Sequence, residues 1–345
     1  MSAGGSPDGA CGPGFDGAPE YFGRAFFGNF PVVMVVSFGS INMDLVVRCE
    51  RVPDHGETVV STGWFTNPGG KGANQAVQAA RLRAESVLVG RVGSDVFGRD
   101  VMNGLSASGV NVVGVTVDPI LSTGVACILV ERGGENRIVV VPGANGAVGA
   151  AELKTLGGLL QPGVVLLLQC EIPFAVVREA AHVAHLRGAT VILDPSPWGS
   201  VTLTAGVFAD VDYLMPNEGE ARALAGTADL KEAAAVLLGL GARTVVVKRG
   251  EKGAFAVGAF ESPEVPAFSV VSVDTTAAGD SFQGAFAASI DLGFDPDMAL
   301  YRAMAAGALT VTRSGAQQSM PDEVEVAAFL ESRLHRGDHL PKQQI

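Results

Sequence analysis

The sequence is poor in cysteine and in charge. Only four cysteines occur among 345 residues, and no two of them form a C-x-x-C pair. This spacing argues against a disulfide scaffold or a zinc site and favours free thiols in a reducing compartment. Charged residues make up 17%, and Asp plus Glu (36) exceed Lys plus Arg (24), so the formal net charge is −12. A surface of this sign disfavours nucleic acid and anionic membranes as partners, although a small anion needs only local positive potential.

Long hydrophobic runs are also missing. The apolar run "VVMVV" at residues 32–36 is much shorter than the roughly 20 residues of a membrane-spanning helix. The N-terminal residues are rich in glycine, and they are acidic where a secretory signal peptide has a basic segment. We therefore expect a disordered N-terminal extension (1–30), a C-terminal tail (336–345) and a cytoplasmic location, with organelle targeting left open by the extension.

From residue 32 onward, strand patterns alternate with helical patterns. Apolar strand patterns occupy residues 32–38, 86–92, 164–170, 190–195, 211–216 and 242–250, and helical patterns occupy residues 72–82, 95–109, 175–188, 218–226, 280–290 and 296–312. Continuous apolar strands followed by helices predict an α/β fold with a mostly parallel sheet covered on both faces. Ligands of such sheets bind at the carboxyl ends of the strands.

Two segments break this rhythm. Residues 56–67 and 124–145 predict β-hairpins without a crossover helix, the second turning at Gly133-Gly134. We expect them to form a small sheet, at about residues 45–68 and 123–143, inserted as a lid into one domain of residues 31–335. An exposed sheet of this kind aggregates, covers a site or pairs with a second subunit.

The stretch "TAAGD", residues 276–280, places three small residues and one acid at the start of a helical pattern. The small side chains of Ala277, Ala278 and Gly279 let a ligand approach their backbone N–H groups closely. Free N–H groups and the helix dipole favour an anion at such a helix start. Asp280 is then either an acid placed for chemistry beside a bound phosphate or an ordinary capping residue.

The stretch "NPGGKGANQ", residues 67–75, predicts an open glycine loop before a helix. It lacks the first glycine of a Walker loop and the Ser or Thr that should follow Lys71. Gln75 stands where a dinucleotide fingerprint needs its third glycine. Lys71 and Asn74 instead offer a charge and an amide that suit a polyhydroxyl ligand, the alternative being a plain strand-to-helix turn.

Three weaker patterns accompany these loops. Asn42 and Asp44 alternate after the first strand, so they can point the same way toward vicinal hydroxyls, although such pairs are common in turns. Asn217 and Glu220 lie three apart at a helix start, which suits magnesium-bound water or phosphate but is also ordinary capping. Residues 245–255 combine a strand with a glycine turn on which a nucleotide could lie.

In their order along residues 32–330, these motifs resemble those of the phosphofructokinase-B-type carbohydrate kinase family. The resemblance rests on "GSINMD", "GGKGANQAVQAA", "STGVA", "GAN", "NEGEA", "VDTTAAGDSFQGA" and "TRSGAQQSMP". The forms "GGKGANQ" and "TRSGAQ" are more similar to ribose-phosphorylating members than to fructose or adenosine kinases. The resemblance implies a three-layer α/β/α sandwich with a β-sheet lid, often shared in a homodimer. It also implies ATP with Mg²⁺ as donor and the 5-hydroxyl of D-ribose as acceptor.

The same resemblance implies roles for individual residues. The sugar would be held by Asn42, Asp44, Gly70, Lys71, Asn74 and Glu171. The nucleotide would contact Asn217, Lys248, Arg249, Gly250, Glu251, Lys252, Gly253 and Gly279, with Met304 near the base. Asp280 would be the catalytic base beside an anion hole formed by Ala277, Ala278 and Gly279. Asn217 and Glu220 would act on Mg²⁺ indirectly.

A monovalent cation, usually K⁺, is implied as well. Its ligands would come from Asp274, Thr276, Thr310, Arg313, Gly315 and Ser319. At Arg313 only the backbone carbonyl can serve, because a guanidinium does not ligate a cation. Met304 stands where relatives often have a polar residue, so the preferred nucleotide base stays open.

Two alternatives remain from the sequence. One is another sugar or nucleoside kinase of the same family, acting on deoxyribose, fructose or adenosine. The other is a non-catalytic regulator that binds sugar or nucleotide, which the intact "AAGD" disfavours because such a protein could lose Asp280 freely.

Overall fold

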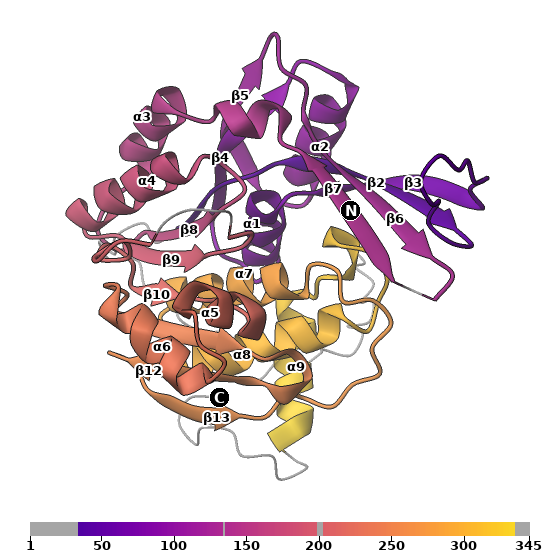
Figure 1. The fold of residues 1–345 in the computed structure, drawn as a ribbon. Coiled ribbons are helices and arrows are strands. Elements are labelled where there is room, and N and C mark those ends of the chain that lie inside the picture. The colour runs from indigo at the N-terminus through magenta and orange to yellow at the C-terminus, as the bar shows by residue number, and fades with distance from the viewer. Residues whose placement is uncertain (1–33, 134, 199–202, 335–345) are drawn as a thin grey trace, which may run out of the picture. The chain divides into compact units, whose positions relative to one another are not determined.

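The computed structural model describes residues 34–133, 135–198 and 203–334 (Figure 1). The predicted N-terminal extension, the predicted C-terminal tail and Gly134 of the predicted turn lie outside these residues. Within them, no helix is long and apolar enough to cross a membrane.

A nine-stranded sheet forms the centre of the fold. Its spatial order is β13 (Ser262–Val265), β12 (Ala254–Gly258), β11 (Thr244–Lys248), β10 (Tyr213–Leu214), β9 (Thr190–Asp194), β8 (Val165–Gln169), β1 (Val35–Phe38), β4 (Ser86–Gly93) and β5 (Asn111–Asp118). The pairings from β11 to β5 are parallel, and β12 and β13 add an antiparallel edge. The predicted mostly parallel sheet is confirmed.

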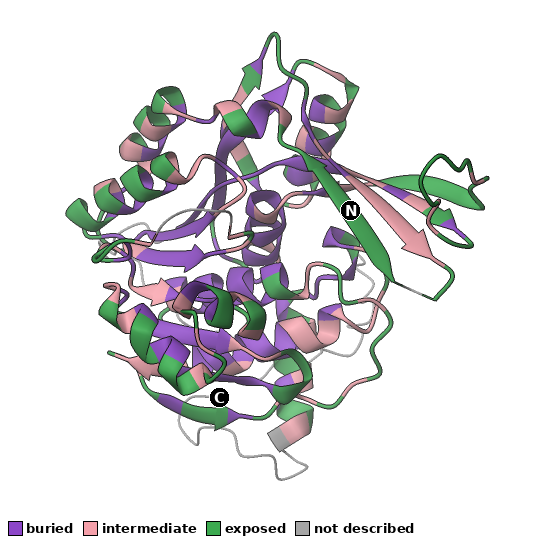
Figure 2. Ribbon diagram, viewed as in Figure 1, coloured by how far each residue is buried: buried purple, intermediate pink, exposed green. Residues whose placement is uncertain are grey.

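Helices cover both faces of this sheet because neighbouring residues of its buried strands point to opposite sides. Val36 and Leu166 pack in the core under one group of helices, and Val35 and Leu167 pack under the other. The first group is α3 (Ala150–Leu159), α4 (Phe174–Leu186), α5 (Glu218–Ala225) and α6 (Leu230–Gly239). The second is α1 (Lys71–Arg81), α7 (Ala278–Asp291), α8 (Pro296–Thr310) and α9 (Glu323–Leu334). Helix α2 (Val96–Ala107) packs with α1. The result is the expected three-layer α/β/α sandwich, with its sheet buried (Figure 2).

A second sheet of four strands forms the lid. Its order is β3 (Gly63–Gly69), β2 (Asn42–Cys49), β6 (Gly124–Glu131) and β7 (Asn136–Val141). The predicted hairpin within 124–145 is confirmed, since β6 and β7 pair antiparallel. The predicted hairpin within 56–67 is wrong. Residues 50–62 form a loop with a turn at His55-Gly56, and β3 pairs with β2 instead. The physical reason is that the extended segment beginning at Asn42 continues to Cys49. This long strand β2 offers two edges, and β3 and β6 pair with them.

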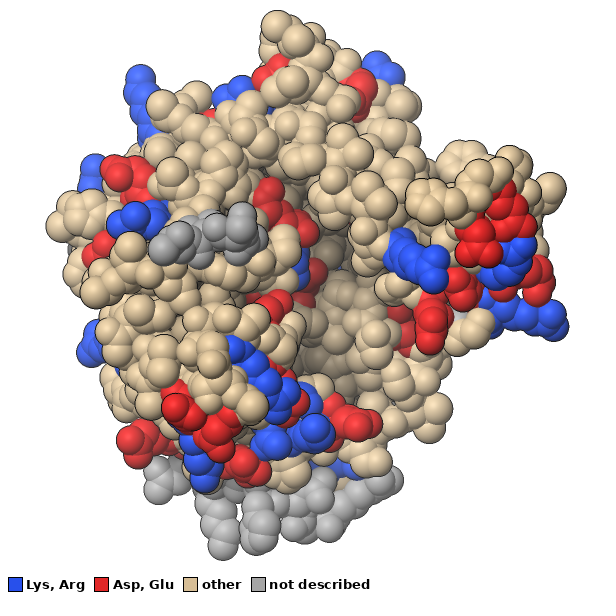
Figure 3. All heavy atoms as spheres, viewed as in Figure 1, with Lys and Arg blue, Asp and Glu red and all other residues tan. Residues whose placement is uncertain are grey.

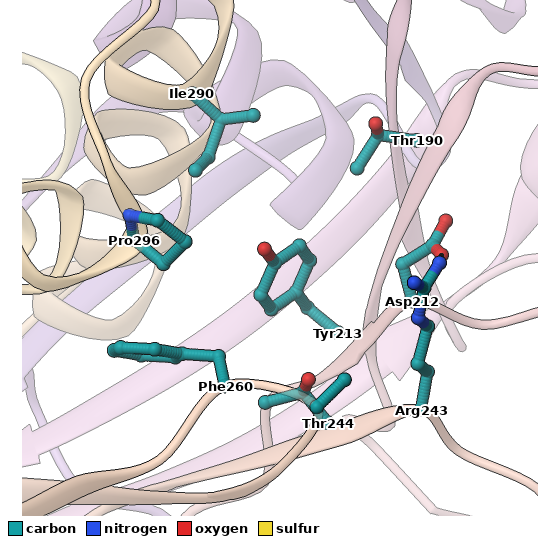
Figure 4. A pocket seen from close by; sticks show the side chains of 9 residues that line it. Thr190, Asp212, Tyr213, Arg243, Thr244, Phe260, Ile290 and Pro296 are labelled. Carbon is teal, nitrogen blue, oxygen red and sulfur yellow. Dashed lines mark ion pairs between the residues drawn. The ribbon is translucent and has the colours of Figure 1, made fainter.

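The two edges of the main sheet carry different features. Asp194 and Lys248 end β9 and β11, so they mark the carboxyl edge, where ligands are expected. Strand β1 lies between β4 and β8. The next strands of the main sheet along the chain, β4 and β5, lie on one side of β1, and the later strands, from β8 onward, lie on the other side. At the amino edge, a cavity of about 260 Å³ is lined by Thr190, Tyr213 and Thr244, with Arg243 and Asp212 beside them (Figure 4).

Candidate active site

The molecule is hollowed between the lid and the main sheet, and acidic and basic atoms lie on the wall of this hollow (Figure 3). Six segments bring the charged groups together: strand β2, the segment after β8, the ends of β9 and β11, and the starts of α1 and α7. The carboxylates are Asp44, Glu171, Asp194 and Asp280, and the ammonium groups are Lys71 and Lys248. The site is therefore built from residues far apart in the chain.

Helix α7 provides the start predicted for an anion site. Ala277 precedes the helix with φ +58°, in the left-handed region, so the chain turns sharply there. The N–H groups of Gly279 and Asp280 make no hydrogen bond to a backbone carbonyl of the described chain, whereas Ala278 N–H donates to Thr275 O at 3.3 Å. A Cβ added to Gly279 would meet only Lys248 Nζ, at 3.9 Å. Open space, free donors and a nearby ammonium group fit a bound phosphoryl group.

The carboxylate of Asp280 is buried and held by amides. It accepts hydrogen bonds from Asn74 Nδ2 (2.9 Å) and Gln75 Nε2 (3.3 Å), and Lys71 Nζ lies 4.0 Å away. Burial is the main cause that raises the pKa of Asp280, and Lys71 and Asn74 oppose this without cancelling it. A carboxylate with a raised pKa is a stronger base, which suits proton abstraction.

The glycine loop before α1 is shaped by its neighbours in the protein. Gly70 has φ +88°, which favours glycine. A Cβ on Gly72 would lie 2.7 Å from the carbonyl carbon of Gly39, so the start of α1 and the end of β1 touch through backbone alone. This contact brings Lys71 and Asn74 to the hollow. The glycine loop was predicted to allow close approach to a ligand. The close approach that the structure shows is between the start of α1 and the backbone of Gly39.

The predicted sugar residues of the lid lie at its root. Asn42 is buried, and its side-chain oxygen accepts a hydrogen bond from Asn145 Nδ2 (2.7 Å), so its NH₂ group remains available as a donor. Burial first, then the charges of Glu171 and Asp280, raise the pKa of Asp44 to about 7. Glu171 Oε2 accepts from Ser40 Oγ (2.5 Å) and from the Lys71 N–H (3.1 Å). Amide and carboxyl groups therefore converge as the sugar prediction requires.

The predicted nucleotide residues are placed unequally. Lys248 faces the hollow beside Gly279, and Gly250, Glu251 and Lys252 form an exposed turn. Arg249 pairs with Glu218 and Glu264, each at 3.0 Å.

Gly253 and Met304 lie inside the protein. A Cβ on Gly253 would lie 1.8 Å from Val265 O, and Met304 is buried in the core between α7 and α8. Gly253 therefore lacks the open space that surrounds Gly279, and the side chain of Met304 is packed in the core.

Asn217 and Glu220 cap helix α5 reciprocally. Asn217 Oδ1 accepts from the Glu220 N–H and Glu220 Oε2 accepts from the Asn217 N–H, both at 2.8 Å. Asn217 also forms a parallel β-bridge with Lys248, which places this cap next to the hollow. The capping interpretation is thus realised, and each side chain keeps an oxygen or amide that could meet a water.

The predicted cation residues lie in or near two segments, one around Thr276 and one around Gly315. The carboxylate of Asp274 joins these segments through hydrogen bonds. Its carboxylate accepts from the Thr276 N–H (2.9 Å), the Thr276 hydroxyl (2.6 Å) and the Gly315 N–H (2.9 Å). The hydroxyls of Thr310 and Ser319 are buried and donate within the protein, and Arg313 pairs with Glu325. Carbonyl oxygens and Asp274 are therefore the groups that fit K⁺. The described residues contain no group of three or more His, Cys, Asp or Glu that could hold a metal.

Four site residues were missing from the sequence prediction: Gln75, Asn145, Gln169 and Asp194. Gln169 Nε2 donates to Gln75 Oε1 (2.7 Å), which in turn holds Asp280. Asn145 accepts from the Ile41 N–H (2.9 Å) as well as donating to Asn42. Asp194 lies 3.6 Å from both Lys71 Nζ and Lys248 Nζ. Asp194 and Gln169 lie at the ends of predicted strands at the ligand-binding edge. Gln75 and Asn145 end the quoted stretches "GGKGANQ" and "GAN", so a signal was present although no role was assigned to them.

Lys71 is the centre of this electrostatic arrangement. Burial alone would lower its pKa, but the carboxylates around it, Asp194 foremost and then Asp280 and Glu171, raise the pKa overall. The ammonium group therefore stays charged. A permanent positive charge next to a base and an anion site is what phosphoryl transfer to a hydroxyl needs.

Comparisons with known proteins point to one family. Residues 33–323 match the model of the pfkB family carbohydrate kinases. The chain is 40% identical to a ribokinase of Schizosaccharomyces pombe, over 86% of this chain and 97% of that one. It is 33% identical to a deoxyribokinase of Salmonella typhi, over 86% and 98%. A solved structure of Arabidopsis thaliana ribokinase complexed with ribose and ATP is similar with a TM-score of 0.77 and 32% identity, over 87% of this chain and 99% of that one. The chain belongs to the pfkB family of carbohydrate kinases.

Proposed function

We propose that the protein transfers the γ-phosphoryl group of ATP to the 5-hydroxyl of D-ribose, giving D-ribose 5-phosphate. The observation that carries the proposal is the buried Asp280 carboxylate beside the open start of α7, with Lys71 and Lys248 on either side. Similarity to ribokinases supports ribose as the sugar.

In this mechanism the sugar lies between the lid root and Asp280. Asn42, Asp44 and Glu171 would hold its hydroxyls, with Gly70, Lys71 and Asn74 beside them, and Asp280 would accept the proton of the 5-hydroxyl. The N–H groups at Gly279 and Asp280 would stabilise charge that develops on the phosphoryl oxygens. The lid would exclude water, since an open site hydrolyses ATP.

The nucleotide side rests on fewer contacts. Lys248 would neutralise phosphate charge, and the exposed turn at Gly250–Lys252 and the cap at Asn217 would border the nucleotide. Mg²⁺, when bound with ATP, would neutralise phosphate charge, and Asn217 and Glu220 would hold it indirectly, through water. K⁺ would be held by Asp274 and the carbonyls of its two loops, where it would fix the segment that leads into the anion site.

We also propose a homodimer formed through the lid. Strand β7 exposes the apolar side chains of residues 138–141, and Trp64 of β3 is 70% exposed. A long exposed apolar sheet is ordinarily covered in solution. The cytoplasmic location stays a prediction.

The test is sugar-dependent ADP release with D-ribose, 2-deoxyribose, fructose and adenosine. We expect D-ribose to give the highest kcat/KM, and replacement of K⁺ by a large organic cation at fixed ionic strength to slow turnover. A higher kcat/KM for 2-deoxyribose or adenosine would reassign the acceptor. Binding of ribose and ATP without turnover would identify a regulator and overturn the kinase proposal.

A further inference from the structure

Asp194 is a buried acid to which the mechanism above assigns no role. It is the last residue of β9 and is 1% exposed. A buried carboxylate is costly unless it is paired and hydrogen-bonded. Yet its Oδ1 atom has no hydrogen-bond partner within the described chain. A buried carboxylate with an oxygen that accepts no hydrogen bond is costly to the fold, so a role in the site is the explanation to test.

The two partners of Asp194 lie on opposite sides of the proposed reaction. Lys71 Nζ is 3.6 Å from Asp194 Oδ2 and 4.0 Å from Asp280 Oδ1, on the side of the base. Lys248 Nζ is 3.6 Å from Asp194 Oδ1 and is the nearest atom to the open space above Gly279, on the side of the phosphate. One carboxylate thus holds a cation at each of the two places where charge changes.

Neither ion pair is a short hydrogen bond. Charge-assisted N–H···O bonds measure about 2.7–2.9 Å, whereas both distances from Asp194 are 3.6 Å. Asp194 therefore holds each ammonium group by its charge and not by a short hydrogen bond. A phosphoryl group with more negative charge could draw either lysine forward without breaking a short bond.

We propose that Asp194 is a positioning residue that holds Lys71 at the base and Lys248 at the anion site, so that both cations meet the transferring phosphoryl group. The inference rests on the proposed kinase function. It differs from a purely stabilising role because it requires Asp194 to act through both lysines.

The primary test is Asp194→Asn, which keeps the size of the side chain and removes its charge. We expect kcat to fall about 10- to 100-fold, the scale of a misplaced group in an active site, while KM for the sugar stays within about threefold. Asp212→Asn is the matched control. Asp212 pairs with Arg243 at 3.6 Å beside the cavity at the amino edge (Figure 4), so this variant should keep the parental kcat.

Double variants separate positioning from stabilisation. In Lys71→Met and in Lys248→Met backgrounds, Asp194→Asn should lower kcat by less than in the parent, because the cation it positions is gone. Full additivity in both backgrounds would overturn the inference, as would a folded Asp194→Asn enzyme with the parental kcat.

Two further measurements complete the test. If Asp194→Asn does not fold, Asp194→Glu shifts the carboxylate by one methylene and should also lower kcat with KM retained, whereas a parental kcat would overturn the inference. If the parent releases no ADP with any sugar, the proposed function fails on its own. The inference is then judged by a crystal structure of Asp194→Asn, in which both ammonium nitrogens should leave residue 194. Nitrogens that keep their places would overturn it.

Discussion

The two sheets of this protein differ in almost every physical respect. Strands β1 and β8 of the main sheet are buried at every position, whereas β7 of the lid is exposed at every position. The proposed base, the proposed anion site and both lysines belong to the buried layers, and the lid contributes Asn42 and Asp44 at its root. The comparison teaches that the groups whose position the proposed mechanism must fix lie in the packed body, while the proposed role of the lid is to select and cover the sugar.

The largest effect is expected from Asp280→Asn, a substitution in the packed body. Loss of a general base should lower kcat by about 10²- to 10⁴-fold while sugar and ATP still bind. Asp291→Asn, at the other end of α7, is the matched control and should leave kcat unchanged. Steady-state kinetics with calorimetric binding would check both. Turnover of Asp280→Asn within threefold of the parent would remove Asp280 from the role of base.

Gly279→Ala tests the anion site without harming the body. The new methyl group meets nothing closer than 3.9 Å, and Ala in a helix is more stable than Gly by up to about 1 kcal/mol. We therefore expect an unchanged or higher Tm together with kcat lowered about 10- to 100-fold, since the methyl group occupies the phosphate position. Gly158→Ala on α3, also in open space, should raise Tm without changing kcat. A Gly279→Ala enzyme with full activity would exclude the site.

Asp44 tests the root of the lid through pH. Its pKa of about 7 in the sugar-free protein means that the carboxylate is mostly protonated at pH 6 and mostly ionised at pH 8. If the ionised form accepts sugar hydroxyls, KM for the sugar should fall about tenfold over this interval. Asp44→Asn should raise KM and flatten its pH dependence, while Asp54→Asn, exposed on the lid loop, should behave as the parent. A KM of the parent that rises with pH would contradict this role of Asp44.

The smallest effect on chemistry is expected at the outer lid. Val139 of β7 is 65% exposed, so Val139→Lys should disrupt a dimer formed through the lid while changing kcat by less than about threefold. Light scattering after size exclusion would report the mass. A parent that is already monomeric, or a variant that stays dimeric, would contradict dimerisation through this strand.

Local patterns predicted much of this fold and part of the site. The helices that start at Lys71 and Ala278 and the buried strands β4 and β8 follow from periodicity and glycine placement within short windows. The predicted hairpin at 56–67 failed because β3 pairs with β2, and nothing in the local sequence indicates that partner. Gln75, Asn145 and Asp194 were missed for the same reason, since each acquires its role from residues about 100 to 200 positions away.

The hydrogen bonds between α1 and α7 have a consequence for the protein during its synthesis. Asn74 donates a hydrogen bond to Asp280, and Gln78 Oε1 accepts from Ser281 Oγ at 2.8 Å, so α1 meets the proposed base only after more than 200 further residues have been made. In a nascent chain the last lid strand, which ends at Val141, is therefore made well before Asp280. If Asp280 is the base, the proposed phosphoryl transfer can begin only after nearly the whole kinase domain has been synthesised.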